Sequence, residues 1–188
     1  MQYLKPCDFI VNVLKNGLII VFTGNGKGKT TAAMGQALRA VGQGLKVLML
    51  QFIKGTWDYG ELESIKRLGP DFKIKPMGKG FIRSKSKLND KEALENINQS
   101  WVQAEEEIFS DKYDMIILDE INYVIDFGLL PVDEMLTLLD KKPNRLHIIL
   151  TGRNAHKKVI ERADLVTEMV EIKHQYSKGI KAQKGIEF

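Results

Sequence analysis

A glycine-rich stretch near the N-terminus has the residue types and the spacing that bind phosphate groups. It runs from Thr23 to Thr30 with the sequence TGNGKGKT, and it matches the pattern G-x-x-x-x-G-K-[ST] except that Thr23 occupies the first-glycine place. We expect the glycines to let successive backbone N–H groups converge on phosphate oxygens, while Lys29 supplies a full positive charge. The Thr30 hydroxyl is suited to a Mg2+ ion that bridges the phosphates. The stretch therefore predicts a nucleoside triphosphate site.

An adjacent pair of carboxylates, Asp119 and Glu120, follows the apolar run Met115–Leu118. Downstream of a phosphate-binding loop, a buried strand that ends in acidic residues is typical of a Walker-B acid, which holds the metal near the phosphates. We therefore expect this acidic pair to lie near a metal ion at Thr30. The second acid either orients a water molecule, as in ATPases, or ligates the metal, and the sequence does not decide between these roles.

Two further basic residues are candidates for phosphate contact. Lys27, inside the glycine-rich stretch, is equally compatible with a phosphate contact and with a solvated loop charge. Arg153 follows a strand-like run, where it either neutralises phosphate charge or simply stands at the start of a helix. The histidines share no metal-ligand spacing, so we expect them to be structural; they are His147, His156 and His174.

Short apolar runs alternate with helical segments along the chain. The runs of strand length are Leu18–Phe22, Lys46–Phe52, Met115–Leu118 and Leu146–Leu150. A helix is predicted from Thr30 to about Val41, directly after the glycine-rich stretch. This alternation predicts an α/β protein with a three-layer P-loop (RecA-like) NTPase fold and a mainly parallel sheet. Ligands of such sheets bind at the carboxyl ends of the strands, where the glycine-rich loop and the acidic pair would meet.

The clearest helix is predicted from about Asp90 to Ser110, and Asn89 and Glu92 have the spacing of a capping box at its start. Its apolar residues recur at spacings of three and four; they are Leu94, Ile97, Trp101, Ala104 and Ile108. We therefore expect Trp101 to be a core residue. The preceding segment, 53–88, is rich in glycine and proline and is predicted to be a binding loop with one short helix and a possible strand.

The composition is that of one soluble domain. The chain has 188 residues, 44% hydrophobic and 28% charged, and no apolar run near the roughly 20 residues of a membrane helix. The N-terminus lacks a signal-peptide pattern, so we expect a cytoplasmic protein. Cys7 is the only cysteine, which excludes an internal disulfide and a thiol-rich zinc site. The net charge of +4 and the pI near 9.0 come from dispersed basic residues, which nucleotide phosphate explains as well as nucleic acid does.

Several motifs together resemble the P-loop class of ATP:cob(I)alamin (corrinoid) adenosyltransferases. They stand in the family's order along the chain: Gly24–Ala33, Gln51–Gly55, Leu118–Glu120, Thr151–Arg153, Ala163–Glu168, Lys173–His174 and Gly179–Glu187. The combination is specific, whereas the phosphate-binding loop alone is not. The resemblance implies an adenosyltransferase domain over residues 17–188 and leaves residues 1–16 as an N-terminal segment that could cap the active site.

The resemblance implies transfer of the 5′-deoxyadenosyl group of ATP to the cobalt(I) of a reduced corrinoid, with release of triphosphate, in adenosylcobalamin biosynthesis or corrinoid salvage. ATP would lie reversed in the loop relative to ordinary NTPases, so that the loop holds the leaving group. The implied catalytic residues are Lys29, Thr30, Glu120 and Phe81, the last of them facing the corrin. The implied nucleotide-binding residues are Gly24, Asn25, Gly26, Lys27, Gly28, Lys29, Thr30, Thr31, Arg39 and Arg153. Mg2+, or Mn2+, would be held by Thr30 and Glu120 with Asp119 in support.

The same resemblance implies a homodimer and an electron-donating reductase as partners, with no nucleic acid and no membrane. The chain departs from the family at Arg83, where several members carry a tryptophan two residues beyond the phenylalanine that Phe81 matches. An arginine does not offer the same apolar wedge to the corrin.

Three other functions remain open from the sequence. A RecA-like ATPase that acts on nucleic acid would use the same loop and acidic pair, and would release orthophosphate. A small-molecule kinase would move the γ-phosphate to a hydroxyl group. A corrinoid-delivery protein would bind its ligand without turnover.

Overall fold

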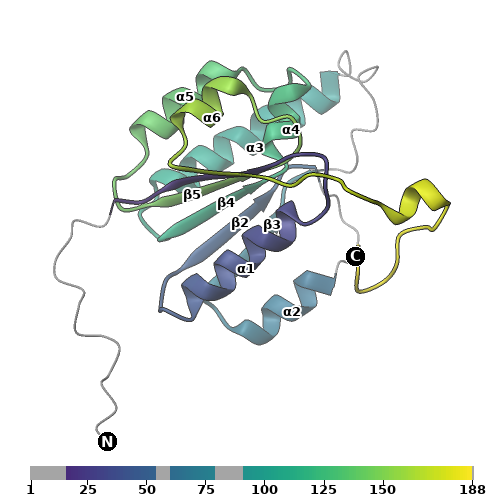
Figure 1. Cartoon of the computed structure of the whole chain (residues 1–188). Coiled ribbons are helices and arrows are strands. Elements are labelled where there is room, and N and C mark those ends of the chain that lie inside the picture. The colour runs from purple at the N-terminus through teal and green to yellow at the C-terminus, as the bar shows by residue number, and fades with distance from the viewer. Residues whose placement is uncertain (1–15, 54–59, 79–90, 188) are drawn as a thin grey trace, which may run out of the picture.

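The computed structural model describes residues 16–53, 60–78 and 91–187. Its sheet has six parallel strands in the order β3-β2-β4-β5-β1-β6 (Figure 1). The strands are β1 Ile19–Thr23, β2 Val47–Gln51, β3 Phe72–Pro76, β4 Met115–Asp119, β5 His147–Thr151 and β6 Leu165–Glu168. The predicted α/β fold is therefore confirmed, and the described sheet is parallel throughout.

Helices cover both faces of this sheet and complete three layers (Figure 1). One face carries α1 (Lys29–Val41) and α2 (Gly60–Leu68). The other face carries α3 (Lys91–Phe109), α4 (Ile121–Asp126), α5 (Val132–Lys141) and α6 (Lys157–Arg162). A short 3-10 helix, η2 (Gln175–Lys178), lies in the C-terminal part of the chain. Among the helices that the structure describes, none has the length and apolar composition needed to span a membrane.

Four of the strands, β1, β2, β4 and β5, are buried on both sides, and each of these contributes to two separate cores. Ile19 and Val21 of β1 belong to the core under α3 to α6, whereas Ile20 between them packs with Ala33 and Ala37 of α1. This alternation follows from the period of two along a strand. It also explains the nearly continuous apolar runs from which the strands were predicted.

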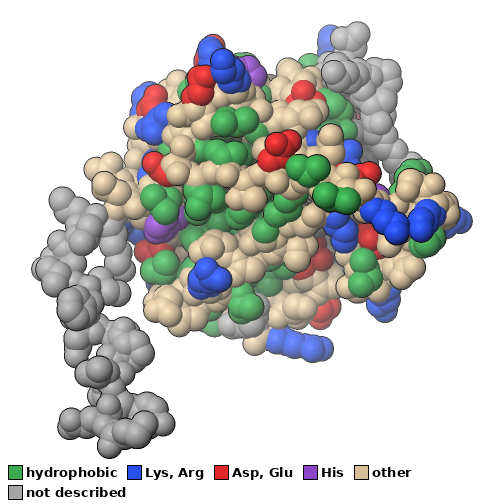
Figure 2. Space-filling view, in the orientation of Figure 1, with side chains coloured by type: hydrophobic (Ala, Val, Ile, Leu, Met, Phe, Trp, Pro, Cys, Tyr) green, Lys and Arg blue, Asp and Glu red, His purple; other side chains and the backbone are tan. Residues whose placement is uncertain are grey.

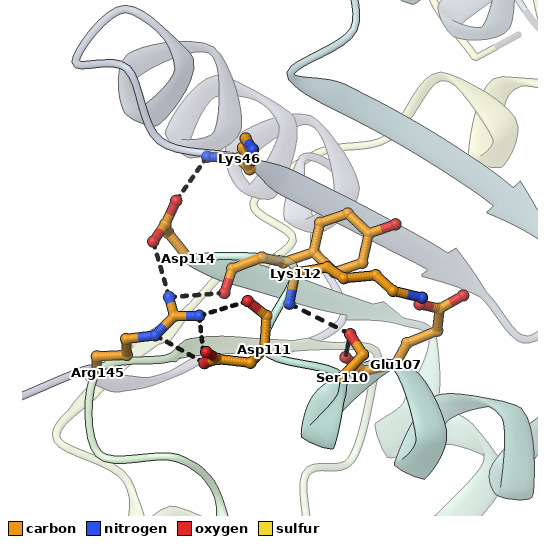
Figure 3. Close-up of polar contacts among 8 residues, drawn as sticks. Lys46, Glu107, Ser110, Asp111, Lys112, Asp114 and Arg145 are labelled. Atoms are coloured by element: carbon orange, nitrogen blue, oxygen red, sulfur yellow. Dashed lines mark hydrogen bonds and ion pairs between the residues drawn. The ribbon is translucent and has the colours of Figure 1, made fainter.

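A hydrogen-bond network connects the N-terminal ends of three neighbouring strands (Figure 3). These ends lie on the side of the sheet opposite the glycine-rich loop. Arg145, before β5, donates to the Asp114 carboxylate across 2.8 Å, to the Tyr113 carbonyl across 3.1 Å and to the Asp111 carbonyl across 2.8 Å. The second oxygen of Asp114 accepts the Lys46 backbone N–H, 2.9 Å away, at the start of β2. The network therefore links the starts of β2, β4 and β5.

The structure also settles the elements that the sequence placed less firmly. The predicted long helix is α3, and Trp101 is 5% exposed in the core, as expected. The capping residue Asn89 lies outside the described residues. The irregular segment contains α2 and β3, and β3 pairs in parallel with β2. β6 was not predicted, because all four of its residues are exposed and carry no burial pattern.

Candidate functional site

A cavity of about 800 Å³ lies at the carboxyl ends of the strands. Its wall brings together the loop after β1, the loops after β4 and β5, the start of α2 and the end of the chain. The lining residues that the sequence had singled out are Asn25, Gly26, Lys27, Gly28, Lys29, Thr30, Thr31, Glu120 and Arg153. Phosphate-binding residues and acidic residues therefore meet in one cavity, as the parallel sheet predicts.

Lys29 is the buried cation of this cavity. Its side chain is enclosed at the start of α1, and its ammonium donates to the carbonyl oxygens of Gly24 and Gly26, each at 2.8 Å. Burial lowers the pKa of Lys29 below its ordinary value; the charge of Glu120 opposes this shift and that of Arg153 adds to it. Two carbonyl acceptors fix the position of the ammonium, so little reorganisation is needed for it to meet a phosphate.

Asp119 is fully buried at the end of β4 and accepts hydrogen bonds from three side chains. The hydroxyls of Thr30 and Thr151 donate to Oδ1, each at 2.8 Å, and the Gln51 amide donates to Oδ2 at 3.3 Å. Glu120 instead lines the cavity, and its backbone has a left-handed φ of 63°. Its N–H donates to the Thr151 hydroxyl across 2.9 Å. The acidic pair thus divides: Asp119 orients its neighbours, and Glu120 faces the ligand space.

The donor set at this point fits a hard divalent cation. The Thr30 hydroxyl and the carboxylates of Asp119 and Glu120 are all oxygen donors, which Mg2+ prefers. Over the described ranges, no group of three or more His, Cys, Asp or Glu side chains could hold a metal by itself. Mg2+ sites commonly combine one or two carboxylates with substrate phosphates, so this partial set is suited to a cation that arrives with a nucleotide.

Thr23, which replaces the first glycine of the pattern, links two loops of the site. Its hydroxyl accepts the backbone N–H of Ala155 across 3.1 Å, beyond the end of β5. Arg153 lies in the same loop, lines the cavity and is near enough to Lys29 to influence its pKa. The threonine therefore ties the loop that carries Arg153 to the strand that carries the glycine-rich loop.

The structure gives a different reason why glycine is needed at positions 24 and 26. A Cβ added at Gly24 or Gly26 would meet the carbonyl oxygen of Met169 at 2.4 or 2.8 Å, far inside van der Waals contact. The Gly26 N–H donates to this same carbonyl across 2.7 Å. The expectation that successive N–H groups all converge on phosphate is therefore wrong at Gly26, because its N–H is already engaged by the chain after β6.

Lys27 lines the cavity, and its side chain is 44% exposed. Its ammonium donates to the Ile186 carbonyl across 2.7 Å and lies 3.6 Å from Oε1 of Glu187.

Another assigned residue lies away from the cavity. Arg39 is exposed in the last turn of α1 and does not line the cavity, because α1 carries it away from the glycine-rich loop. Phe81 and Arg83 lie outside the described residues.

Each histidine accepts a backbone hydrogen bond, as expected of a structural role. The Nδ1 atoms of His147, His156 and His174 accept from Leu18, Lys158 and Tyr176, respectively. His174 also lines the cavity. Sequence reasoning missed this position. It also missed further lining residues on α1, α2 and α4, in the loop after β2 and near the C-terminus: Met34, Ile53, Glu61, Ser64, Tyr123, Ile186 and Glu187. The only signal for the C-terminal ones was the family-like motif that contains them.

Comparisons with known proteins agree with the geometry. The family described as ATP:corrinoid adenosyltransferase BtuR/CobO/CobP matches residues 15–188. The corrinoid adenosyltransferase of Escherichia coli (strain K12) is 41% identical over 175 residues, covering 93% of this chain and 87% of the relative. The corrinoid adenosyltransferase CobA of Salmonella typhimurium is 39% identical with the same coverage, and that of Sinorhizobium sp. is 42% identical, covering 93% and 81%. The chain therefore belongs to the family of ATP:corrinoid adenosyltransferases.

Proposed function

We propose that this protein transfers the 5′-deoxyadenosyl group of ATP to the cobalt(I) of a reduced corrinoid. Cobalt(I) donates an electron pair to C5′, the bond between C5′ and the α-phosphate oxygen breaks, and triphosphate leaves with the bonding pair. The cobalt becomes formally cobalt(III). Because the metal of the substrate is itself the nucleophile, the protein has no need of a covalent catalytic group.

The observation that carries the proposal is the cavity, which joins a phosphate-binding loop to Lys29 and Arg153 in a chain 41% identical to a corrinoid adenosyltransferase. Triphosphate is a highly charged leaving group, and its departure is favoured by fixed positive charge at the phosphates. Lys29, Arg153 and the N-terminal end of α1 supply that charge. Lys29 is held in place by backbone carbonyls before the reaction begins.

We assign the metal to the same set of oxygen atoms. Thr30 and Glu120 would hold Mg2+, or Mn2+, while Asp119 orients the Thr30 hydroxyl from its buried position. When bound, the ion would neutralise negative charge on the triphosphate.

The finer features of the function rest on the family resemblance. We infer that the protein acts as a homodimer in the cytoplasm and that a reductase supplies cobalt(I). Phe81 would face the corrin. ATP would bind with its triphosphate in the loop and C5′ directed toward the corrinoid.

An anaerobic assay with ATP, Mg2+ and chemically reduced cobalamin tests the proposal directly. We expect the absorption spectrum of a light-sensitive cobalt–carbon bond and one intact triphosphate per adduct. Lys29→Met should lose both products, while Lys184→Gln, which removes an exposed positive charge from the C-terminal segment, should retain them.

The rival functions give different products in the same assay. Orthophosphate released in response to DNA or RNA would indicate a nucleic-acid ATPase, and a phosphorylated small molecule would indicate a kinase. Cobalamin binding without a cobalt–carbon bond, in protein shown to bind ATP, would indicate a delivery protein.

A further inference from the structure

The C-terminal segment, defined here as residues 169–187, runs from the end of β6 past the glycine-rich loop to the cavity (Figure 1). Its first attachment is at Met169, whose N–H donates to the Thr23 carbonyl across 2.8 Å and whose carbonyl accepts the Gly26 N–H. The lack of side chains at Gly24 and Gly26 allows this approach. The beginning of the segment is thus joined to the loop by direct backbone contact.

The second attachment is at the other end of the segment, through Lys27 and Glu187. Lys27 donates to the Ile186 carbonyl across 2.7 Å and lies 3.6 Å from Oε1 of Glu187. The same carboxylate accepts the Gln175 side-chain amide at 2.9 Å and the Gln183 backbone N–H at 2.7 Å. The Glu187 side chain is only 19% exposed. It therefore holds η2 and the last turn of the chain together and presents them to Lys27.

This pair lies in the wall between two cavities. A second cavity of about 390 Å³ lies between the glycine-rich loop and the C-terminal segment. It shares lining residues with the main cavity; they are Gly26, Lys27, His174, Ile186 and Glu187. The position of the C-terminal segment therefore sets the boundary of the main cavity on the side of the glycine-rich loop.

The charges around Lys27 and Glu187 indicate that Lys27 compensates a carboxylate of the protein. Basic side chains gather along the C-terminal segment (Figure 2), including the exposed Lys173, Lys178, Lys181 and Lys184. Glu187 is the acidic residue of the segment that lines the main cavity. An uncompensated carboxylate there would repel a polyphosphate, and Lys27 lies close enough to compensate it.

We propose that Lys27 and Glu187 are positioning residues for the triphosphate: together they hold the C-terminal segment as a wall of the nucleotide cavity. Lys27 acts through this wall and not as a simple phosphate ligand. The inference rests on the proposed function only in naming the triphosphate as the ligand, and its test does not require adenosyl transfer.

The first test is Glu187→Gln, measured by calorimetric titration with inorganic tripolyphosphate and Mg2+ and by hydrogen exchange of residues 170–187. Loss of the charge should weaken tripolyphosphate binding about two- to tenfold and speed exchange in the C-terminal segment, because one ion pair and its charge-assisted hydrogen bonds are lost. In the complete reaction, the KM for ATP should rise while kcat at saturating ATP changes by less than about threefold. Lys184→Gln is the matched control for the loss of one charge and should leave binding and exchange near the parent values.

The opposite result would follow if Lys27 were a phosphate ligand and Glu187 only a nearby anion. Glu187→Gln would then tighten tripolyphosphate binding, because it removes a repulsive charge. Tighter or unchanged binding, or unchanged exchange, would overturn the proposal.

A double-mutant cycle provides the second test. If the two residues act as one attachment, their effects on binding should not add. The double variant Lys27→Gln, Glu187→Gln should then bind tripolyphosphate at least as tightly as the single variant that binds it less well. The exchanged pair, Lys27→Glu with Glu187→Lys, should slow hydrogen exchange in the segment relative to either single substitution. Effects that multiply in the double variant, or no rescue in the exchanged pair, would also overturn it.

Discussion

The Thr30 hydroxyl donates a hydrogen bond to Oδ1 of Asp119 across 2.8 Å, although 89 positions separate the two residues in the sequence. The bond fixes the direction of the hydroxyl proton, so the oxygen lone pairs remain for the ligand space. The buried carboxylate thereby sets the orientation of Thr30, which follows Lys29 in the first turn of α1. The first turn of α1 and the end of β4 consequently behave as one unit.

Thr30→Val tests this unit, because it keeps the side-chain shape but removes the donor. We expect the free energy of unfolding to fall by about 1–3 kcal/mol, since a buried carboxylate loses one of its hydrogen bonds. Adenosyl transfer should fall at least about a hundredfold. Thr30→Ser keeps the hydroxyl and should retain most of both properties, measured by urea unfolding and by turnover. Equal behaviour of the two variants would show that the hydroxyl has no such role.

Thr23→Val removes the acceptor for the Ala155 N–H without changing the size of the side chain. The loop that carries Arg153 should loosen, which raises the KM for ATP by a few-fold and speeds hydrogen exchange over residues 152–156. Thr23→Ser is the matched control and should preserve both values. If Thr23→Val leaves the exchange of this loop unaltered, the hydroxyl does not position it.

Gly26→Ala isolates the effect of close backbone approach, because Gly26, unlike Gly24, does not have a positive φ. The new Cβ would meet the Met169 carbonyl oxygen at 2.8 Å, so the C-terminal segment must move. We expect a loss of about 1–3 kcal/mol in unfolding free energy, as for other overpacked sites, and weaker ATP binding.

Gly35→Ala is the control for Gly26→Ala. Nothing lies within 4 Å of its added Cβ, and it is exposed within α1. A glycine in a helix interior costs about 0.5–1 kcal/mol relative to alanine, so this variant should be more stable than the parent. Similar losses in both variants would contradict the close-approach argument.

Local patterns predicted the part of the site that lies near them in the sequence. The glycine-rich loop, Lys29 and the acidic pair each follow a buried strand directly, so recognising the strand places the residue. Trp101 was placed in the core for a similar reason, because its helix has a regular apolar face.

Residues with distant partners could not be placed in this way. Lys27 is 159 positions from the carbonyl that it contacts, and β6, which leads to that partner, has no buried residue to reveal it. Glycine is needed at positions 24 and 26 because the backbone carbonyl of Met169, which is distant in the sequence, lies too close for a side chain. The sequence of β3 indicates a strand only weakly, because Lys73 and Lys75 interrupt its apolar residues and glycines and prolines surround it.

The lowered pKa of Lys29 predicts how polyphosphate binding depends on pH. Burial favours the neutral amine, so the free protein loses this proton at a lower pH than an ordinary lysine, whose pKa is about 10.4. Only the ammonium form attracts phosphate, so tripolyphosphate affinity should fall as pH rises through the lowered pKa. A bound polyanion raises the pKa again, and binding should therefore take up protons within that alkaline window. Calorimetry in buffers of different ionisation enthalpy measures this uptake, and Lys29→Met should abolish it.

Arg145→Ala tests how much the network at the N-terminal ends of the strands, away from the cavity, contributes to stability. The variant loses hydrogen bonds that join the starts of β4 and β5. The Asp114 carboxylate loses its arginine partner and keeps the bond from the Lys46 N–H. We expect a loss of about 1–3 kcal/mol in unfolding free energy, since several bonds share one guanidinium and some are partly buried. The KM for ATP should not change, because the network touches no lining residue of the cavity.

Arg162→Ala is the matched control for Arg145→Ala, because the two arginine side chains are 43% and 40% exposed. Arg162 contacts Asp140, itself 61% exposed, in a simple surface ion pair. Such pairs contribute about 0–1 kcal/mol, so this variant should unfold at nearly the parent urea concentration. If both substitutions destabilise the protein equally, the loss at Arg145 reflects surface charge and not a network that holds the strands together.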